Sequence, residues 1–150
     1  MLNDKIKHSI NRSILCWLAT ASKDGMPNVS PKEVFTYFEN DSIIIANIAS
    51  PNTVKNIRGN AQVCVSFIDI LVQKGFQLKG KATIVRKSDV AFSEMEAQLL
   101  KMTKGRFPFT TITKIKIEST KAIIAPSYLF YPKDTTEAQQ TENAKKAYRL

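Results

Sequence analysis

The chain has 150 residues, of which 43% are hydrophobic and 23% are charged, and its 22 basic residues outnumber its 13 acidic ones to give a net charge of +9. A chain of this length buries about 70% of its unfolded surface in one domain, so it needs no disulfide framework or metal to fold. No apolar run is long enough to span a bilayer, and no membrane partner is expected. Cys16 and Cys64 lie in apolar runs, which predicts core thiols of a cytoplasmic protein.

The excess of positive charge favours an anionic partner such as a phosphorylated cofactor. Nucleic acid is the less favoured partner, because the lysines are dispersed and no nucleic-acid-binding motif is present.

The order of apolar and polar residues predicts an antiparallel, mainly β fold. Residues 3–11 form an amphipathic helix pattern with Ile6 and Ile10 on one side. Six segments then have the alternation or β-branched content of strands. They cover residues 13–20, 28–38, 42–47, 61–70, 73–85 and 110–124. Pro31 cannot donate to a strand ladder and Gly80 weakens one, so we expect an edge or bulge at each.

A further helix is expected over residues 89–102, with Val90, Met95, Leu99 and Met102 as its apolar side. Residues 133–150 are polar and are expected to form a mobile tail that is in part helical. The strand count and turn spacing favour a six-stranded antiparallel split β-barrel with short helices in residues 1–132, followed by that tail.

The chain is organised around residues 43–60, where a buried strand leads directly into a short helix. Ser50 suits the N-cap, Pro51 suits the first helical position, and Gly59 suits the residue just past the helix end. The free N–H groups of such a helix start attract phosphate, and Lys55 and Arg58 follow one and two turns later. An ordinary capped helix that binds nothing is the alternative.

Catalytic equipment is sparse in the sequence. His8 is the only histidine, and no nucleophile–histidine pair, metal-ligand cluster or glycine-rich nucleotide motif occurs. An enzyme with so few acid–base groups needs an organic cofactor to carry its chemistry.

Four stretches in order then resemble a known family. They are LATASKDGMPNVSP, IIIANIASPNTVKNIRGNAQVCVSF, FQLKGKATIV and KIKIESTKAIIAP. Together they resemble the opening hairpin, the phosphate-binding turn with its short helix, and the later strands of the pyridoxamine 5′-phosphate oxidase-like superfamily of FMN-binding split barrels. The resemblance covers roughly residues 5–130.

The resemblance implies a homodimer with FMN held in two clefts at the subunit interface. It places phosphate contacts at the turn, ring contacts along two strands, and further contacts on a third strand. The implied cofactor-binding residues are Ser50, Asn52, Thr53 and Lys55 at the turn and helix, Val29, Ser30, Pro31 and Lys32 beside the ring, Asn47, Ile48 and Ala49 at the strand end, and Gly75, Phe76 and Gln77 on the third strand.

Oxidases of the family often carry an Arg-Lys pair where this chain has Asn52-Thr53, so Lys32, Lys55 or Arg58 is expected to supply the charge. The resemblance implies an FMN-dependent oxidoreductase with an unknown small-molecule substrate or electron donor. The alternative is a non-catalytic flavin- or haem-binding or electron-transfer protein. Thr53→Glu is expected to weaken phosphate binding with little effect on stability.

Overall fold

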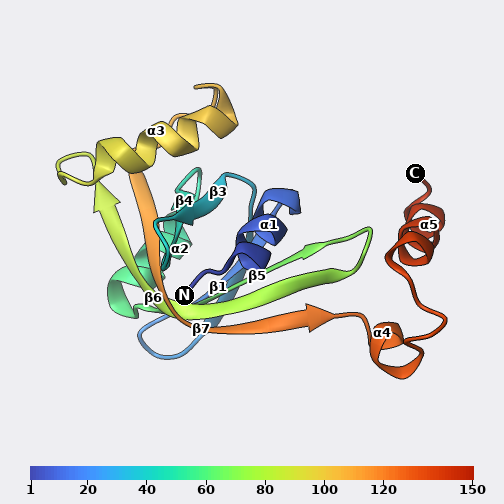
Figure 1. Ribbon diagram of the computed structural model, residues 1–150. Helices are drawn as coiled ribbons and strands as arrows, with labels where there is room; N and C mark the ends of the chain where they lie inside the picture. Colours follow the sequence, from blue (N-terminus) through green and yellow to red (C-terminus); the bar gives the residue numbers. More distant parts are fainter.

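One antiparallel sheet of seven strands, in the order β2-β1-β5-β6-β7-β4-β3, forms the body of the protein (Figure 1). The computed structural model describes all residues 1–150. The strands are β1 Cys16–Ala21, β2 Pro27–Lys32, β3 Phe35–Phe38, β4 Ser42–Ala46, β5 Gln62–Asp69, β6 Lys74–Arg86 and β7 Thr111–Ile124. The helices are α1 Asp4–Arg12, α2 Pro51–Gly59, α3 Phe92–Thr103, α4 Pro126–Phe130 and α5 Glu137–Tyr148. None of these helices is long and apolar enough to cross a membrane.

The sheet curls because its two edge strands are neighbours in the chain. β2 pairs only with β1 and β3 only with β4, yet only Glu33 and Val34 separate β2 from β3. The Ala46 N–H donates to the Val34 carbonyl over 3.0 Å, which ties this link to the β4 side. The sheet is therefore a split barrel, with its opening beside the end of β2.

The sequence pattern treats residues 28–38 as one strand, whereas the structure divides them into β2 and β3 at this link. That division raises the strand count from six to seven. The cause is the exchange of partners: Lys32 pairs with Cys16 of β1, while Phe35 pairs with Ile45 of β4.

The core has two parts, one under α1 and one under α3. Ile6 and Ile10 of α1 are buried against Phe35, Phe67 and Leu78 of the sheet, as the helix pattern predicts. The second part lies under α3. Its members are Phe38, Ile44, Ala46, Val85, Phe92, Met95, Leu99, Phe109 and Ile112.

The predicted apolar side of α3 is half wrong. Met95 and Leu99 are buried, but Val90 is 99% exposed and Met102 is 47% exposed. The helix begins at Phe92 because Asp89 accepts the Arg86 N–H over 2.7 Å and holds the preceding residues in a turn. Phe92 therefore takes the core position that the pattern gave to Val90.

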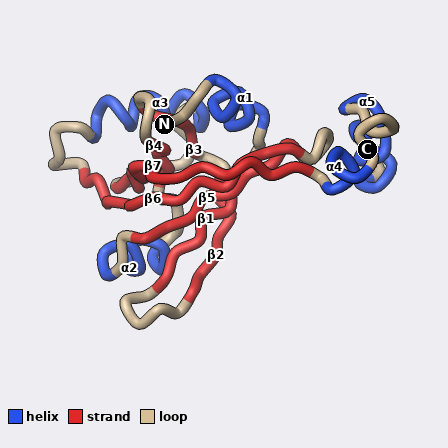
Figure 2. Tube along the Cα trace, turned by 60° about the horizontal axis from the view of Figure 1, so that its bottom comes forward, coloured by secondary structure: helices blue, strands red, loops and turns tan.

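β6 and β7 form a long antiparallel pair that is joined at one end through α3. Its other end, beside the tip of the β5–β6 hairpin, extends beyond the rest of the sheet and leads into α4 and α5 (Figures 1 and 2). The bulge expected at Gly80 is present, since the register shifts between Lys79 and Gly80. A Cβ at Gly80 would lie 2.0 Å from the carbonyl oxygen of Lys116, so only glycine fits this close approach.

Part of the polar C-terminal segment is helical, as expected. Thr136 and Gln139 form a capping box at the start of α5. Lys74 Nζ lies 2.8 Å from Glu137 Oε1, and Gln140 Nε2 donates to Gln73 Oε1 over 3.0 Å, so α5 is attached to the hairpin tip. The expected mobility of this segment stays a prediction.

Candidate functional site

A buried lysine stands at the opening of the split barrel. Lys32, the last residue of β2, is 8% exposed, and its Nζ donates to Ser50 Oγ just before α2. Burial lowers the Lys32 pKa, and the neighbouring Cys16 opposes this only in part. No carboxylate forms an ion pair with Lys32. A buried cation without a counter-charge is costly, so this position suits a bound anion.

The start of α2 is open to such an anion. Ser50 occupies the predicted N-cap position and Pro51 the first turn, but the Ser50 side chain makes no capping hydrogen bond. Its hydroxyl instead donates to the Ile48 carbonyl over 2.9 Å and accepts from Lys32. The uncapped N–H groups and the helix dipole therefore remain available to a ligand. At the other end, Gly59 is the last residue of α2 rather than the residue past it.

Thr53 packs inward from the first turn of α2. It is 2% exposed, and its Oγ1 lies 3.3 Å from Ser30 Oγ on β2. The expectation that Thr53→Glu leaves stability unchanged is therefore wrong, because a longer, charged side chain would be forced into a packed position. Asn52 is exposed on the same turn and is the position where an added charge would test phosphate binding.

A polar, basic hollow of about 420 Å³ opens beside α2. Lys55 and Arg58 line it from the helix, and Asn47 and Thr111 line it from the sheet, with no acidic side chain among the lining residues. Two hydrogen bonds hold the side-chain amide of Asn47 in one orientation. Its Nδ2 donates to Thr111 Oγ1 over 3.1 Å, and its Oδ1 accepts from Thr113 Oγ1 over 2.8 Å. This hollow, which we call the basic hollow, is suited to an anionic group.

A smaller, mostly apolar slot of about 190 Å³ lies on the other side of the Lys32–Ser50 hydrogen bond. Its walls are Pro31, Lys32, Glu33, Val34, Ala46, Ile48 and Phe107. Lys32 lines this apolar slot and Ser50 lines the basic hollow. The hydrogen bond between their side chains therefore lies on the border between the two cavities. The two cavities together suit a ligand with an anionic end and a flat, apolar end.

Most of the predicted cofactor-binding residues come together here. Ser30, Pro31 and Lys32 on β2 meet the segment 47–50 and the first two turns of α2. Val29 is the exception on β2, because it is 56% exposed on the outer face and lines neither cavity.

Gly75, Phe76 and Gln77 lie elsewhere in the same chain. They are on β6, three strand positions from β2, which is about 14 Å at the usual spacing of strands. Gly75 and Phe76 line a separate hollow of about 440 Å³ that also includes His8 of α1. One chain alone therefore does not bring this third group to Lys32.

Six residues that line the two cavities are absent from the sequence prediction, namely Glu33, Val34, Ala46, Val54, Phe107 and Thr111. Val34 lies in the link between β2 and β3, Thr111 begins β7, and Phe107 lies in the loop before it. Only Phe107 has a signal in the sequence, as an aromatic residue in a Gly- and Pro-containing loop. Thr111 meets Asn47 only through the pairing of β4 with β7.

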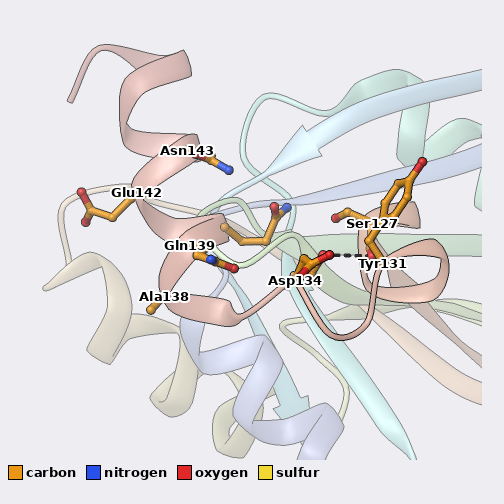
Figure 3. Close-up of a pocket in the computed structure, with 9 residues that line it drawn as sticks. Ser127, Tyr131, Asp134, Ala138, Gln139, Glu142 and Asn143 are labelled. Carbon is orange, nitrogen blue, oxygen red and sulfur yellow. Dashed lines mark hydrogen bonds between the residues drawn. The ribbon is translucent and has the colours of Figure 1, made fainter.

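A larger hollow of about 610 Å³ lies between α4 and α5 (Figure 3). Polar side chains including Ser127, Asp134, Gln139, Glu142 and Asn143 line it, and none of the lining residues is basic. It includes no predicted site residue. No group of three or more metal-ligating side chains occurs anywhere in the chain.

The curled seven-stranded sheet, open beside the start of α2, defines the chain as a split β-barrel protein. The pyridoxamine 5′-phosphate oxidase family model matches residues 2–123, and the chain belongs to this family. No curated protein sequence matches the chain significantly.

Several solved structures share the fold of this chain. HupZ from Group A Streptococcus is 23% identical with a TM-score of 0.68, over 80% of this chain and 92% of that one. An FMN-binding protein from Syntrophomonas wolfei is 18% identical with a TM-score of 0.67, over 79% and 84%. HutZ, the haem storage protein from Vibrio cholerae, is 17% identical with a TM-score of 0.66, over 81% and 94%. These likenesses establish the fold. They do not identify the ligand of this chain.

Proposed function

We propose that the protein binds FMN in the joined cavities at the barrel opening and acts as an FMN-dependent oxidoreductase on a small molecule. The observation that carries this proposal is Lys32, a buried cation without a carboxylate partner between a basic hollow and an apolar slot. FMN has a phosphate at one end and a flat ring at the other, which matches this division.

The residues fit the two ends of FMN in different ways. The open start of α2, with Lys55 and Arg58, would hold the phosphate and replace the charge that Asn52-Thr53 lacks. The apolar slot would hold the ring, with Lys32 at its edge. Asn47 would offer an amide held in one orientation by its two threonine partners. Bound FMN supplies hydride or electron transfer, and the chain positions it and excludes water.

We further propose that the functional unit is a homodimer. Trp17 and Val29 are about half exposed on the outer face of β1 and β2, and Ile68 of β5 is also exposed on the sheet. Gly75 and Gln77 lie in the same outward-facing register on β6. A second copy covering this face would bury the apolar side chains and would bring its own β6 residues towards the cofactor.

The dimer has a direct measurement. Light scattering coupled to size-exclusion chromatography should give about twice the chain mass of 16.8 kDa. A single-chain mass at micromolar concentration would contradict it.

Cys16 and Cys64 are both free thiols, which supports the proposed cytoplasmic location.

The cofactor proposal is tested on the purified protein. The protein should be yellow, or should become so with added FMN, and heating should release FMN that is identified by mass. A colourless protein that takes up no FMN during reconstitution would refute the proposal.

A non-catalytic flavin- or haem-binding protein is the second candidate. The observation that favours it is the shortage of proton-transfer groups: Lys32 and Glu33 are the only titratable side chains in the slot, and His8 lies on α1 in another hollow. Consumption of NADH or NADPH by the FMN-loaded protein would favour the oxidoreductase. No consumption, together with tight binding of haemin, would favour the second candidate.

A further inference from the structure

An aromatic side chain outside the predicted site forms one wall of the apolar slot. Phe107 lies in the loop that joins α3 to β7, and it is 53% exposed although it faces Val34, Ala46 and Ile48 across the slot. Because Phe107 is only half covered by the chain and lines the slot, part of its ring is free to contact a ligand that enters there.

The loop holds Phe107 in place from both sides. Before it, the Gly105 N–H donates to Thr103 Oγ1 over 3.2 Å, and the Arg106 N–H donates to the Thr103 carbonyl over 3.1 Å. After it, Phe109 is buried and packs against Phe92 of α3 with ring centroids 6.4 Å apart. The position of Phe107 is therefore set by the loop, and the phenyl ring is presented to the slot in advance of any ligand.

None of the other residues that line the slot is aromatic, so Phe107 provides the only aromatic surface there. A planar heteroaromatic ring entering the slot would gain offset stacking or edge contact with this phenyl group in addition to apolar burial. The basic hollow contains no aromatic side chain, so this interaction belongs to the ring end of a ligand and not to its anionic end.

We propose that Phe107 is the ring-binding residue of the site: it contacts the flavin ring and contributes affinity independently of the phosphate contacts. This inference rests on the proposed function, because it assigns the slot to the ring of FMN. It separates the site into a ring subsite set by Phe107 and a phosphate subsite set by α2, and the two subsites can be measured with different ligands.

The experiment compares FMN with riboflavin, which has the same ring and no phosphate. Phe107→Ala should weaken the binding of both by about tenfold, measured by calorimetry or flavin fluorescence. Phe107→Trp should retain binding and should quench the fluorescence of bound flavin, since an indole in contact with the ring quenches it by electron transfer. Phe130→Ala is the matched control, because Phe130 is 75% exposed on α4 and lines neither cavity.

The outcomes separate this inference from the proposed function. If the wild-type chain binds neither FMN nor riboflavin, both fail. If the wild-type chain binds FMN but Phe107→Ala binds both flavins as Phe130→Ala does, the role of Phe107 is refuted and FMN binding stands. A loss confined to FMN would also refute it, because the residue would then act through the phosphate. Unchanged thermal unfolding of Phe107→Ala, expected for a half-exposed side chain, shows that the loop is intact.

Discussion

Lys32→Met should separate folding from ligand binding in this protein, because the two depend on Lys32 in opposite directions. The ammonium of Lys32 is buried, has a lowered pKa and has no carboxylate partner. Methionine has a similar length and no charge. The free energy of unfolding without ligand should therefore stay the same or rise by roughly 1 kcal/mol.

FMN affinity should fall in the same variant. A hydrogen bond to a charged group contributes about 1.5–3 kcal/mol, which corresponds to a 10- to 150-fold increase in the FMN Kd. Lys55→Met is the comparison variant for an exposed cation of the same proposed site. Lys55 is exposed on α2, and a solvent-screened charge contributes about 1 kcal/mol or less, or at most about fivefold in Kd.

The pH dependence gives an independent check. The pKa of Lys32 in the folded chain lies below its ordinary value of 10.5, so the unfolded chain binds more protons between the two values. The stability of the wild-type chain therefore gains from Lys32 as pH rises through that window, and the advantage of Lys32→Met shrinks there.

Urea unfolding without flavin and FMN titration by fluorescence measure the two effects. An FMN Kd within twofold of the wild-type value would refute the role of Lys32 as a cation that binds FMN. A clear loss of stability in Lys32→Met would refute the argument that its burial is costly.

Three further predictions concern the fold. Gly80→Ala should lower the free energy of unfolding by more than about 1 kcal/mol in urea, because its Cβ would lie 2.0 Å from the Lys116 carbonyl oxygen; an unchanged midpoint would show that the bulge can relax. Burial by itself would raise the Asp69 pKa, but the 2.7 Å contact from Arg12 and backbone N–H groups hold it below 3.8. Asp69→Asn should therefore be less stable than the wild type at pH 7, and the difference should vanish as pH falls through the folded pKa of Asp69; a difference independent of pH would contradict this. A thiol reagent should label the native chain slowly and only at Cys64, because Cys16 is buried and burial raises its pKa to about 12. Labelling of the native Cys64→Ser variant would show that Cys16 is accessible and would refute this prediction.

Local sequence signals were sufficient for the regular elements. Ile6 and Ile10 at a four-residue spacing predicted α1, and Gly80 predicted the bulge in β6. They failed at α3, where both Val90 and Phe92 could begin an apolar face. The choice depends on the Asp89 turn and on a core that only the folded sheet presents.

The division of residues 28–38 could not be found from local pattern. Its two halves read as one alternating strand, and only the identity of the partner strands separates them. The same limit applies to the site. The β2 and α2 residues were implied by the family resemblance, which rests on contiguous motifs, whereas Thr111 and Val34 join the cavities through pairing across the sheet.

The sequence by itself determined that residues 43–60 form a strand leading into a helix with Pro51 in its first turn, and its net charge favours an anionic partner. These follow from local backbone preferences and from net charge, which do not depend on distant residues. The tertiary structure decided what that helix start faces. By closing β2 against α2, it buried Lys32 beside Ser50 and left the ammonium without a carboxylate. Burial changes the cost of a charge by far more than any local preference does, so the anion site is a property of the closed sheet.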